Sequence, residues 1–133
     1  MPEQEMPNKE IITSANAPQP IGPYSAAVKS GKFVFTAGQI GIDPQTGEVV
    51  SGGVEAETRQ VMQNLKSLLE AAGSSLDSVV KTTVFLRDMG DFAAMNSIYG
   101  EFFNQEPPAR TTVQVAGLPM GVAVEIEAVA VLP

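Results

Sequence analysis

The chain has 133 residues and a formal net charge of −7, and it contains neither cysteine nor histidine. These absences exclude disulfides, thiolate nucleophiles and Cys-based metal sites, and they remove the commonest metal ligand and the commonest general base near neutral pH. No carboxylate cluster has the pattern of a calcium loop, so we expect no metal, and the acidic charge disfavours nucleic acid as a partner.

The length fits one domain, residues 1–133. Residues 1–10 (MPEQEMPNKE) are polar and acidic, so we expect a flexible end that is unlike a signal peptide, which favours a cytoplasmic location. The segment 16–25 (NAPQPIGPYS) contains three prolines, which predicts a rigid irregular arm carrying Tyr24.

A hairpin is predicted next. Residues 32–42 (KFVFTAGQIGI) favour a strand interrupted by Gly38 and Gly41, where glycine marks a bulge or a close approach of the backbone. The turn sequence DPQTGEVV (43–50) then returns the chain.

From residue 54, apolar residues recur at three- and four-residue steps, which predicts an amphipathic helix that ends at Gly73. The polar residues outside this stripe are expected to face solvent: Glu55, Glu57, Gln60, Lys66 and Glu70.

A strand over 78–88 follows, and Asp91 is a suitable N-cap for a second helix. We expect one side of the strand to hold Val80, Thr82, Val84 and Leu86. The apolar stripe of the helix is formed by Phe92, Met95, Tyr99, Phe102 and Phe103.

Two final strands are predicted at 110–117 and 122–132, giving a β-β-α-β-α-β-β order. The order favours an α+β fold whose mixed sheet has two helices on one face. The last strand is largely apolar on both faces, so the face without helices is expected to pack against a second copy of the chain. No apolar stretch is long enough to span a membrane, because Gly121, Glu125 and Glu127 interrupt the longest one.

Arg110 and Glu125 are the main candidates for chemistry. Arg110 follows Pro107-Pro108, and a guanidinium can bind a carboxylate through two parallel hydrogen bonds. Glu125 shares a strand face with Glu127, and a carboxyl group in an apolar setting has a raised pKa and can activate water. The alternatives are a salt bridge between Arg110 and these carboxylates, or a position of all three in solvent.

Tyr24, Asn96 and Thr112 are weaker candidates. Tyr24 could donate a hydrogen bond or form an apolar wall, although packing is the commoner role of such a residue. Asn96 lies off the apolar stripe of its helix, as a surface residue would, and Thr112 is ordinary in a strand.

The chain resembles the RidA family of YjgF-like reactive intermediate deaminases from about residue 10 to its end. The segments that carry the resemblance are IGPYS (21–25), FTAGQIGIDPQTGEV (35–49), VVKTTVFLRDMGDFAAMNSIYGEFF (79–103), PPARTTVQVAGLP (107–119) and VEIEAVAV (124–131). The resemblance implies a chorismate-mutase-like ββαβαββ fold that forms a homotrimer around a central β-barrel, with each site built between two subunits.

The implied activity is hydrolysis of enamines and imines, such as 2-aminoacrylate and 2-aminocrotonate, to 2-oxo acids and ammonia without a cofactor. By the same resemblance Arg110 binds the substrate carboxylate and Glu125 positions the attacking water. Tyr24, Gly38, Asn96 and Thr112 would line the substrate site. Ala37 and Thr112 stand where a serine and a cysteine are often found in the family, so the substrate preference stays open.

Three other functions remain open at this point. An endoribonuclease that inhibits translation is disfavoured by the charge and by the missing histidine. A sensor could bind 2-oxo acids through the same arginine without turnover. In a purely structural trimer, Arg110 would contribute only to stability.

Overall fold

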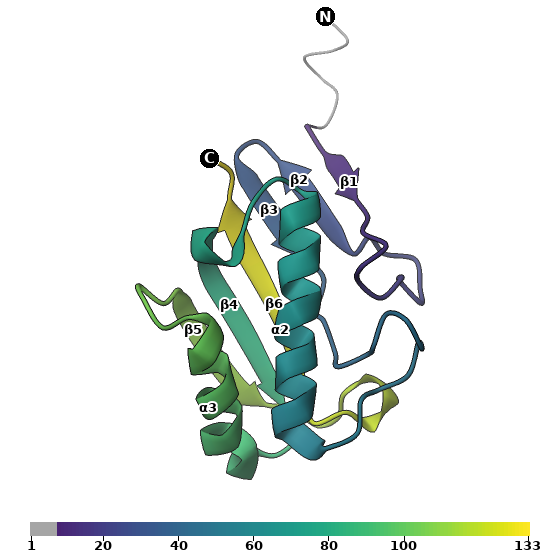
Figure 1. The fold of residues 1–133 in the computed structure, drawn as a ribbon, viewed down its shortest axis with the longest axis vertical. Coiled ribbons are helices and arrows are strands. Elements are labelled where there is room, and N and C mark those ends of the chain that lie inside the picture. The colour runs from purple at the N-terminus through teal and green to yellow at the C-terminus, as the bar shows by residue number, and fades with distance from the viewer. Residues whose placement is uncertain (1–7) are drawn as a thin grey trace, which may run out of the picture.

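The computed structural model describes residues 8–133, which form a six-stranded sheet with two helices of 19 and 11 residues against it (Figure 1). In chain order the elements are β1 (Glu10–Ile12), β2 (Ala27–Ser30), β3 (Phe33–Thr36), α2 (Gly53–Ala71), η1 (Leu76–Ser78), β4 (Val79–Leu86), η2 (Met89–Asp91), α3 (Phe92–Phe102), β5 (Ala109–Gln114), η3 (Pro119–Gly121) and β6 (Val124–Val131). The strands lie in the order β1-β2-β3-β6-β4-β5, and β4–β5 is the parallel pair of an otherwise antiparallel sheet. The predicted α+β class with a mixed sheet is therefore confirmed.

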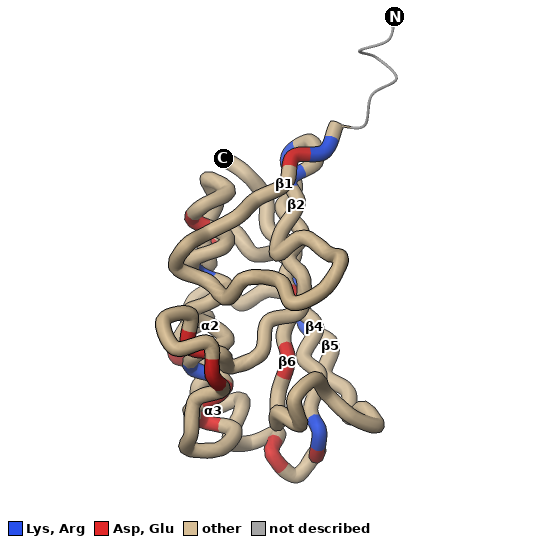
Figure 2. Tube along the Cα trace, turned by 90° about the vertical axis from the view of Figure 1, so that its right-hand side faces the viewer, with Lys and Arg blue, Asp and Glu red and all other residues tan. Residues whose placement is uncertain are grey.

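Both helices cover the same face of this sheet (Figure 2). Along β6 the buried residues are Val124, Ile126, Ala128 and Ala130, whereas the alternating residues from Glu125 to Val131 are half-buried or exposed. This alternation places one side of β6 in the core and the other on the helix-free face.

The helix-free face carries large apolar side chains. Phe33 and Phe35 pair across the ladder with Val131 and Val129, so all four share this face, and the two phenylalanines are 45% and 44% exposed. Large exposed apolar patches mark surfaces that contact another protein, and the expected second copy of the chain on this face stays a prediction.

Helix α2 supplies much of the core and ends where the sequence predicts. Five of its apolar side chains are fully buried: Val61, Met62, Leu65, Leu68 and Leu69. Gly73 has φ 87°, and the N–H groups of Gly73 and Ser74 bond the carbonyls of Glu70 and Leu69. This is a Schellman ending, in which glycine takes the left-handed conformation without a Cβ clash.

The hairpin predicted over 32–50 is wrong in its strands. The strand that begins at Phe33 ends at Thr36 and pairs with β2, which the sequence did not predict. Residues 37–42 instead run as a loop beside β6, to which the isolated Gln39–Ile126 bridge joins them. Of the second strand predicted for this hairpin, only the isolated Ile42–Val49 bridge on either side of the turn is present in the described residues.

Glu57 and Val80 also differ from expectation. Glu57 is 9% exposed, because its Oε1 accepts a hydrogen bond from the Ala123 N–H at 2.8 Å. Val80 is 44% exposed, because a register shift between Val79 and Lys81 turns it away from the buried row that begins at Thr82.

Asp91 takes the predicted N-cap position of α3, yet its side chain makes no capping bond. In the predicted apolar stripe, Phe92 is 36% exposed rather than buried. The expectation of a flexible end falls, for residues 1–7, outside the described residues; it is wrong for Glu10, which pairs with Lys29 in β1–β2. No helix within 8–133 has the length and apolar character needed to cross a bilayer.

Candidate functional site

Arg110 lies at the start of β5 with its side chain directed to α3. Its Nη1 donates a 2.7 Å hydrogen bond to the Oδ1 of Asn96, and both side chains are half-buried. The alternative of a salt bridge to Glu125 or Glu127 is wrong, since neither carboxylate pairs with Arg110. A guanidinium has five N–H donors, so one bond to Asn96 leaves others for a ligand.

Two aromatic rings also contact this guanidinium. Its Cζ lies 4.8 Å from the Tyr99 ring centroid and 5.4 Å from that of Phe92. Tyr99 is buried and shares a 2.7 Å hydrogen bond with Thr82 of β4. Burial raises the pKa of Tyr99, against the opposing effects of that hydrogen bond and of the Arg110 charge, so the hydroxyl stays neutral. The guanidinium is thus held in one orientation before any ligand binds.

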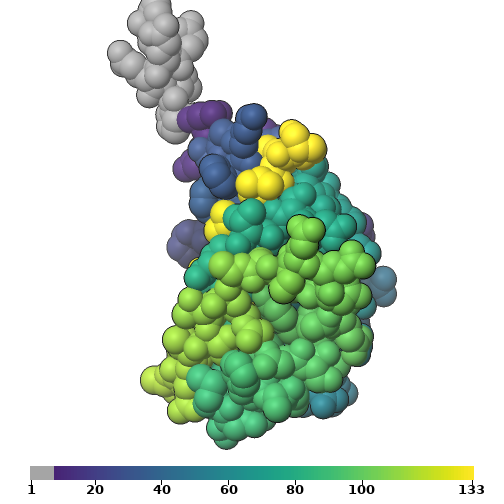
Figure 3. All heavy atoms as spheres, turned by 90° about the vertical axis from the view of Figure 1, so that its left-hand side faces the viewer, coloured from purple at the N-terminus to yellow at the C-terminus, as the bar shows by residue number. Residues whose placement is uncertain are grey.

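Thr112 follows Arg110 on the same face of β5. Its Oγ1 is, within residues 8–133, the buried side-chain oxygen that has no hydrogen-bond partner. Buried hydroxyl groups normally have a partner, so an outside group is needed to satisfy this one. In Figure 3 the atoms of α3 and β5 lie side by side on the molecular surface.

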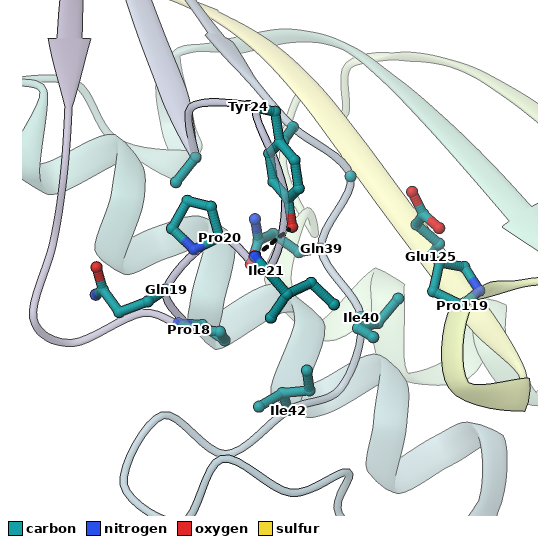
Figure 4. A pocket seen from close by; sticks show the side chains of 13 residues that line it. Pro18, Gln19, Pro20, Ile21, Tyr24, Gln39, Ile40, Ile42, Pro119 and Glu125 are labelled. Atoms are coloured by element: carbon teal, nitrogen blue, oxygen red, sulfur yellow. Dashed lines mark hydrogen bonds between the residues drawn. The ribbon is translucent and has the colours of Figure 1, made fainter.

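Glu125 belongs to a separate hollow. A cavity of about 400 Å³ is bounded by the proline-rich arm, the loop 37–42 and the start of β6 (Figure 4). The residues that line it include Pro20, Ile21, Tyr24, Ala37, Gly38, Gln39, Ile40, Ile42, Pro119 and Glu125. The walls are mostly apolar, and Glu125 is their one charged side chain.

Gly38 and Tyr24 both line this cavity, and their role in binding a substrate stays a prediction. A Cβ on Gly38 would be 2.7 Å from the Cδ and 2.9 Å from the Cγ of Glu125, and nearer still to its Oε2. A side chain at this position would therefore displace the carboxylate. The Tyr24 hydroxyl accepts a 3.3 Å hydrogen bond from the Ile21 N–H, which fixes the ring at the cavity wall.

The environment of Glu125 favours its protonated form. Burial raises the pKa of the Glu125 carboxyl, and the negative charge of Glu127 adds to the effect. A carboxyl group with a raised pKa is a better proton acceptor near neutral pH than an exposed one.

Arg110 and Glu125 of one chain lie on opposite faces of the sheet. Arg110 pairs with Thr82, whose side chain bonds α3, whereas Glu125 pairs with Phe85. Residues paired across a ladder share a face, and positions 82 and 85 have opposite parity along the strand. The structure thus places the predicted site residues in two groups: Arg110, Asn96 and Thr112 beside α3, and Glu125, Gly38 and Tyr24 in the cavity.

Comparison with known proteins shows the family to which this chain is related. The family described as Endoribonuclease L-PSP, which is the YjgF/RidA family, matches residues 14–132. The chain belongs to this family. The predicted resemblance is confirmed.

Relatives within the family match over nearly their whole length. A RutC family protein of Pyrococcus horikoshii, PH0854, is 57% identical over 92% of this chain and 97% of its own. The mouse 2-iminobutanoate/2-iminopropanoate deaminase is 48% identical over 92% and 91%. The structure of E. coli TdcF with bound serine superposes with a TM-score of 0.89 at 44% identity, covering 93% of this chain and 99% of that one.

Sequence reasoning missed the contacts of Tyr99 and Phe92 with Arg110. Both aromatic residues were assigned to the apolar stripe of α3, which is correct for Tyr99. The available signal was the spacing of Phe92, Asn96 and Tyr99, four and then three residues apart on one side of the helix, which could have indicated a surface for a cation.

Proposed function

We propose that this protein is a 2-iminobutanoate/2-iminopropanoate deaminase, a hydrolase of C=N bonds that converts enamine and imine intermediates to 2-oxo acids and ammonia. The names of the mouse and human relatives, each 48% identical, support this activity. The observation that carries the proposal is the pair of half-sites: an oriented guanidinium with N–H donors left for a ligand, and a half-buried carboxyl group in an apolar cavity.

The complete site forms between two copies of the chain. Because one chain holds Arg110 and Glu125 on opposite faces, the Arg110 group of one copy is brought to the Glu125 cavity of its neighbour. The exposed apolar residues of the helix-free face supply a surface for this assembly, in the homotrimer with a central barrel that the family resemblance implies.

Each group then has a defined role. The Arg110 guanidinium binds the substrate carboxylate through two parallel hydrogen bonds, and Asn96 and Thr112 line the site around the same ligand. The enamine first tautomerises to the electrophilic imine. Water attacks the imine carbon and one of its protons passes to Glu125, while the C=N electron pair moves to nitrogen. Nitrogen takes this proton back from Glu125, which gives a neutral carbinolamine. Glu125 then accepts the carbinolamine hydroxyl proton and donates it to nitrogen as the C–N bond breaks and the C=O bond forms, which leaves the 2-oxo acid and ammonia.

The description of the family names an endoribonuclease, but the residues of this chain favour deamination. There is no histidine to act as the general base of RNA cleavage, and the net charge of −7 repels a phosphate backbone. A 2-oxo acid sensor would use the same Arg110 half-site, and turnover distinguishes it from the enzyme.

A coupled assay tests the proposal. Threonine dehydratase releases 2-aminocrotonate, and the formation of 2-oxobutyrate is followed with and without this protein. We expect the wild-type protein to abolish the lag between release of 2-aminocrotonate and formation of 2-oxobutyrate, and folded Arg110→Ala to leave this lag unchanged. No acceleration at protein concentrations equal to that of the dehydratase would refute deamination of this substrate.

A further inference from the structure

Three polar residues of helix α2 connect it to the loop 37–42 and to the chain before β6, directly or through one another, and we name them the α2 clamp: Glu57, Gln60 and Asn64. Their spacing of three, four and seven residues puts them on one helix face. Asn64 is 0% exposed and Glu57 9% exposed, among side chains that are otherwise mainly apolar. Polar groups buried this deeply cost stability unless they are bonded, so their partners indicate what the clamp does.

Asn64 fixes the loop. Its Nδ2 donates to the carbonyl oxygens of Ile40 at 3.2 Å and Ile42 at 3.0 Å, while its Oδ1 accepts from the Gln60 Nε2 at 2.9 Å. Both amide hydrogens are therefore used to hold loop carbonyls that have no place in the sheet ladder. The two isoleucine side chains line the cavity that contains Glu125.

Glu57 fixes the chain that enters β6. Its Oε1 accepts from the Ala123 N–H, two residues before Glu125. Gly41 lies so close to the helix that a Cβ there would be 2.9 Å from the Glu57 Cα. The loop and the start of β6 are thus fastened to the same helix face, and they are joined to each other by two Gln39–Ile126 backbone bonds of 2.8 and 3.1 Å.

These two segments carry Gly38 and Glu125, whose close contact sets where the carboxyl group can lie. We propose that Asn64 and Glu57 are positioning residues of the deaminase, which hold Gly38 against Glu125 and so fix the position and the burial of its carboxyl group. This inference rests on the proposed function. Neither side chain touches the cavity, so their effect on the reaction passes through Glu125.

The titration of Glu125 reports the clamp directly. The groups that face Glu125 are few: Glu127 on its own strand, Tyr24 on the cavity wall, and uncharged Gly38 and Pro119. Its ladder partner Phe85 is uncharged, and Lys81 of β4 lies on the same sheet face beyond Glu127. Loosening the loop exposes the carboxyl group, so its pKa falls toward the value of a free side chain.

The experiment measures the Glu125 pKa by NMR of carbon-13-labelled glutamate in the intact protein, together with kcat and KM. Asn64→Ala is expected to lower the Glu125 pKa and to reduce kcat about 10-fold or more with a smaller change in KM, since a displaced catalytic group is costly. Gln60→Ala, which removes only the support of Asn64, shifts both quantities in the same direction by less. Glu57→Gln retains an oxygen that can accept a hydrogen bond from the Ala123 N–H, so it is expected to preserve the Glu125 pKa and the kcat that Glu57→Ala loses.

Val61→Ala is the control for lost stability. This side chain lies on the same helix and is fully buried, but it belongs to the main core rather than to the Ile40–Ile42 cluster. It is expected to lower the free energy of unfolding without moving the Glu125 pKa. If Asn64→Ala, or Gln60→Ala where the former does not fold, leaves the Glu125 pKa and kcat as in Val61→Ala, the positioning role is refuted. The NMR titration needs no substrate, so an inactive wild type would refute the proposed function separately.

Discussion

Adding one methyl group at Gly38 tests how Glu125 is held. In Gly38→Ala the new Cβ would lie 2.7 Å from the Glu125 Cδ and 2.9 Å from its Cγ, closer than carbon atoms pack. The backbone φ of Gly38 is not in the left-handed region, so the clash with Glu125 is the main consequence. The side chain of Glu125 must rotate away, which moves the carboxylate by an ångström or so.

A misplacement of that size lowers kcat/KM by about 100-fold, which corresponds to ~2.7 kcal/mol in the activation barrier. Overpacking lowers the free energy of unfolding by about 1–3 kcal/mol. In a Glu125→Ala background the clash is absent, so Gly38→Ala is expected to change the free energy of unfolding little. A double-mutant cycle on the free energies of unfolding should then assign most of the loss to the interaction between positions 38 and 125.

The assays are 2-oxobutyrate formation from 2-aminocrotonate and urea unfolding. Gly100→Ala is the matched control, because a Cβ there meets no atom within 4 Å and lies in α3. It is expected to keep full activity and to gain roughly 0.5–1 kcal/mol of stability. Wild-type activity in Gly38→Ala, or an equal stability loss with and without Glu125, would show that this contact does not position the carboxylate.

Four further outcomes follow from the two half-sites. Because the reaction needs ionised Glu125, the acid limb of the kcat/KM profile should lie above pH 4.5, the ordinary carboxyl pKa. Glu127→Gln removes the neighbouring negative charge, so it should move this limb to lower pH, although burial of Glu125 should still hold the limb above pH 4.5. The raised pKa of Glu125 means that its ionised form lowers the free energy of unfolding at pH values above that pKa, and this destabilisation disappears as the pH falls through the pKa. Glu125→Gln removes the ionisable group, so this variant should unfold at a higher urea concentration than the wild type at pH 7. Asn96→Leu removes the 2.7 Å bond that orients Arg110 and should raise KM about 10-fold or more, as measured by initial rates. Thr112→Val removes a hydroxyl with no partner in the described chain, so it should raise KM about 2- to 10-fold without lowering the unfolding midpoint.

Periodicity was enough to predict the long elements. Helix α2 and strand β6 have strong apolar repeats, and Gly73 ends the helix by a local rule, so these agree with the structure. Strands β1 and β2 are only three and four residues long, and β2 has one β-branched residue, so no local signal separated them from the proline-rich arm.

The burial of polar residues depended on contacts distant in sequence. Glu57 is buried because of a backbone N–H 66 residues away, and Asn64 because of carbonyls 22 and 24 residues away. For the candidate site, residue type and family resemblance identified Arg110 and Glu125. Their separation onto opposite faces required the strand register, which no local pattern contains.

Mixing two inactive variants tests the shared site most directly. Arg110→Ala and Glu125→Ala are unfolded together and refolded as mixed oligomers, whose formation is checked by native mass spectrometry. If each site takes Arg110 from one chain and Glu125 from its neighbour, an equal mixture should recover about a quarter of wild-type activity, because each cyclic interface needs one particular variant on each side. Wild type mixed equally with the double variant should likewise retain about a quarter, whereas a site within one chain would retain about half. No recovered activity in verified mixed oligomers of the two single variants would contradict a site built from two copies of this chain.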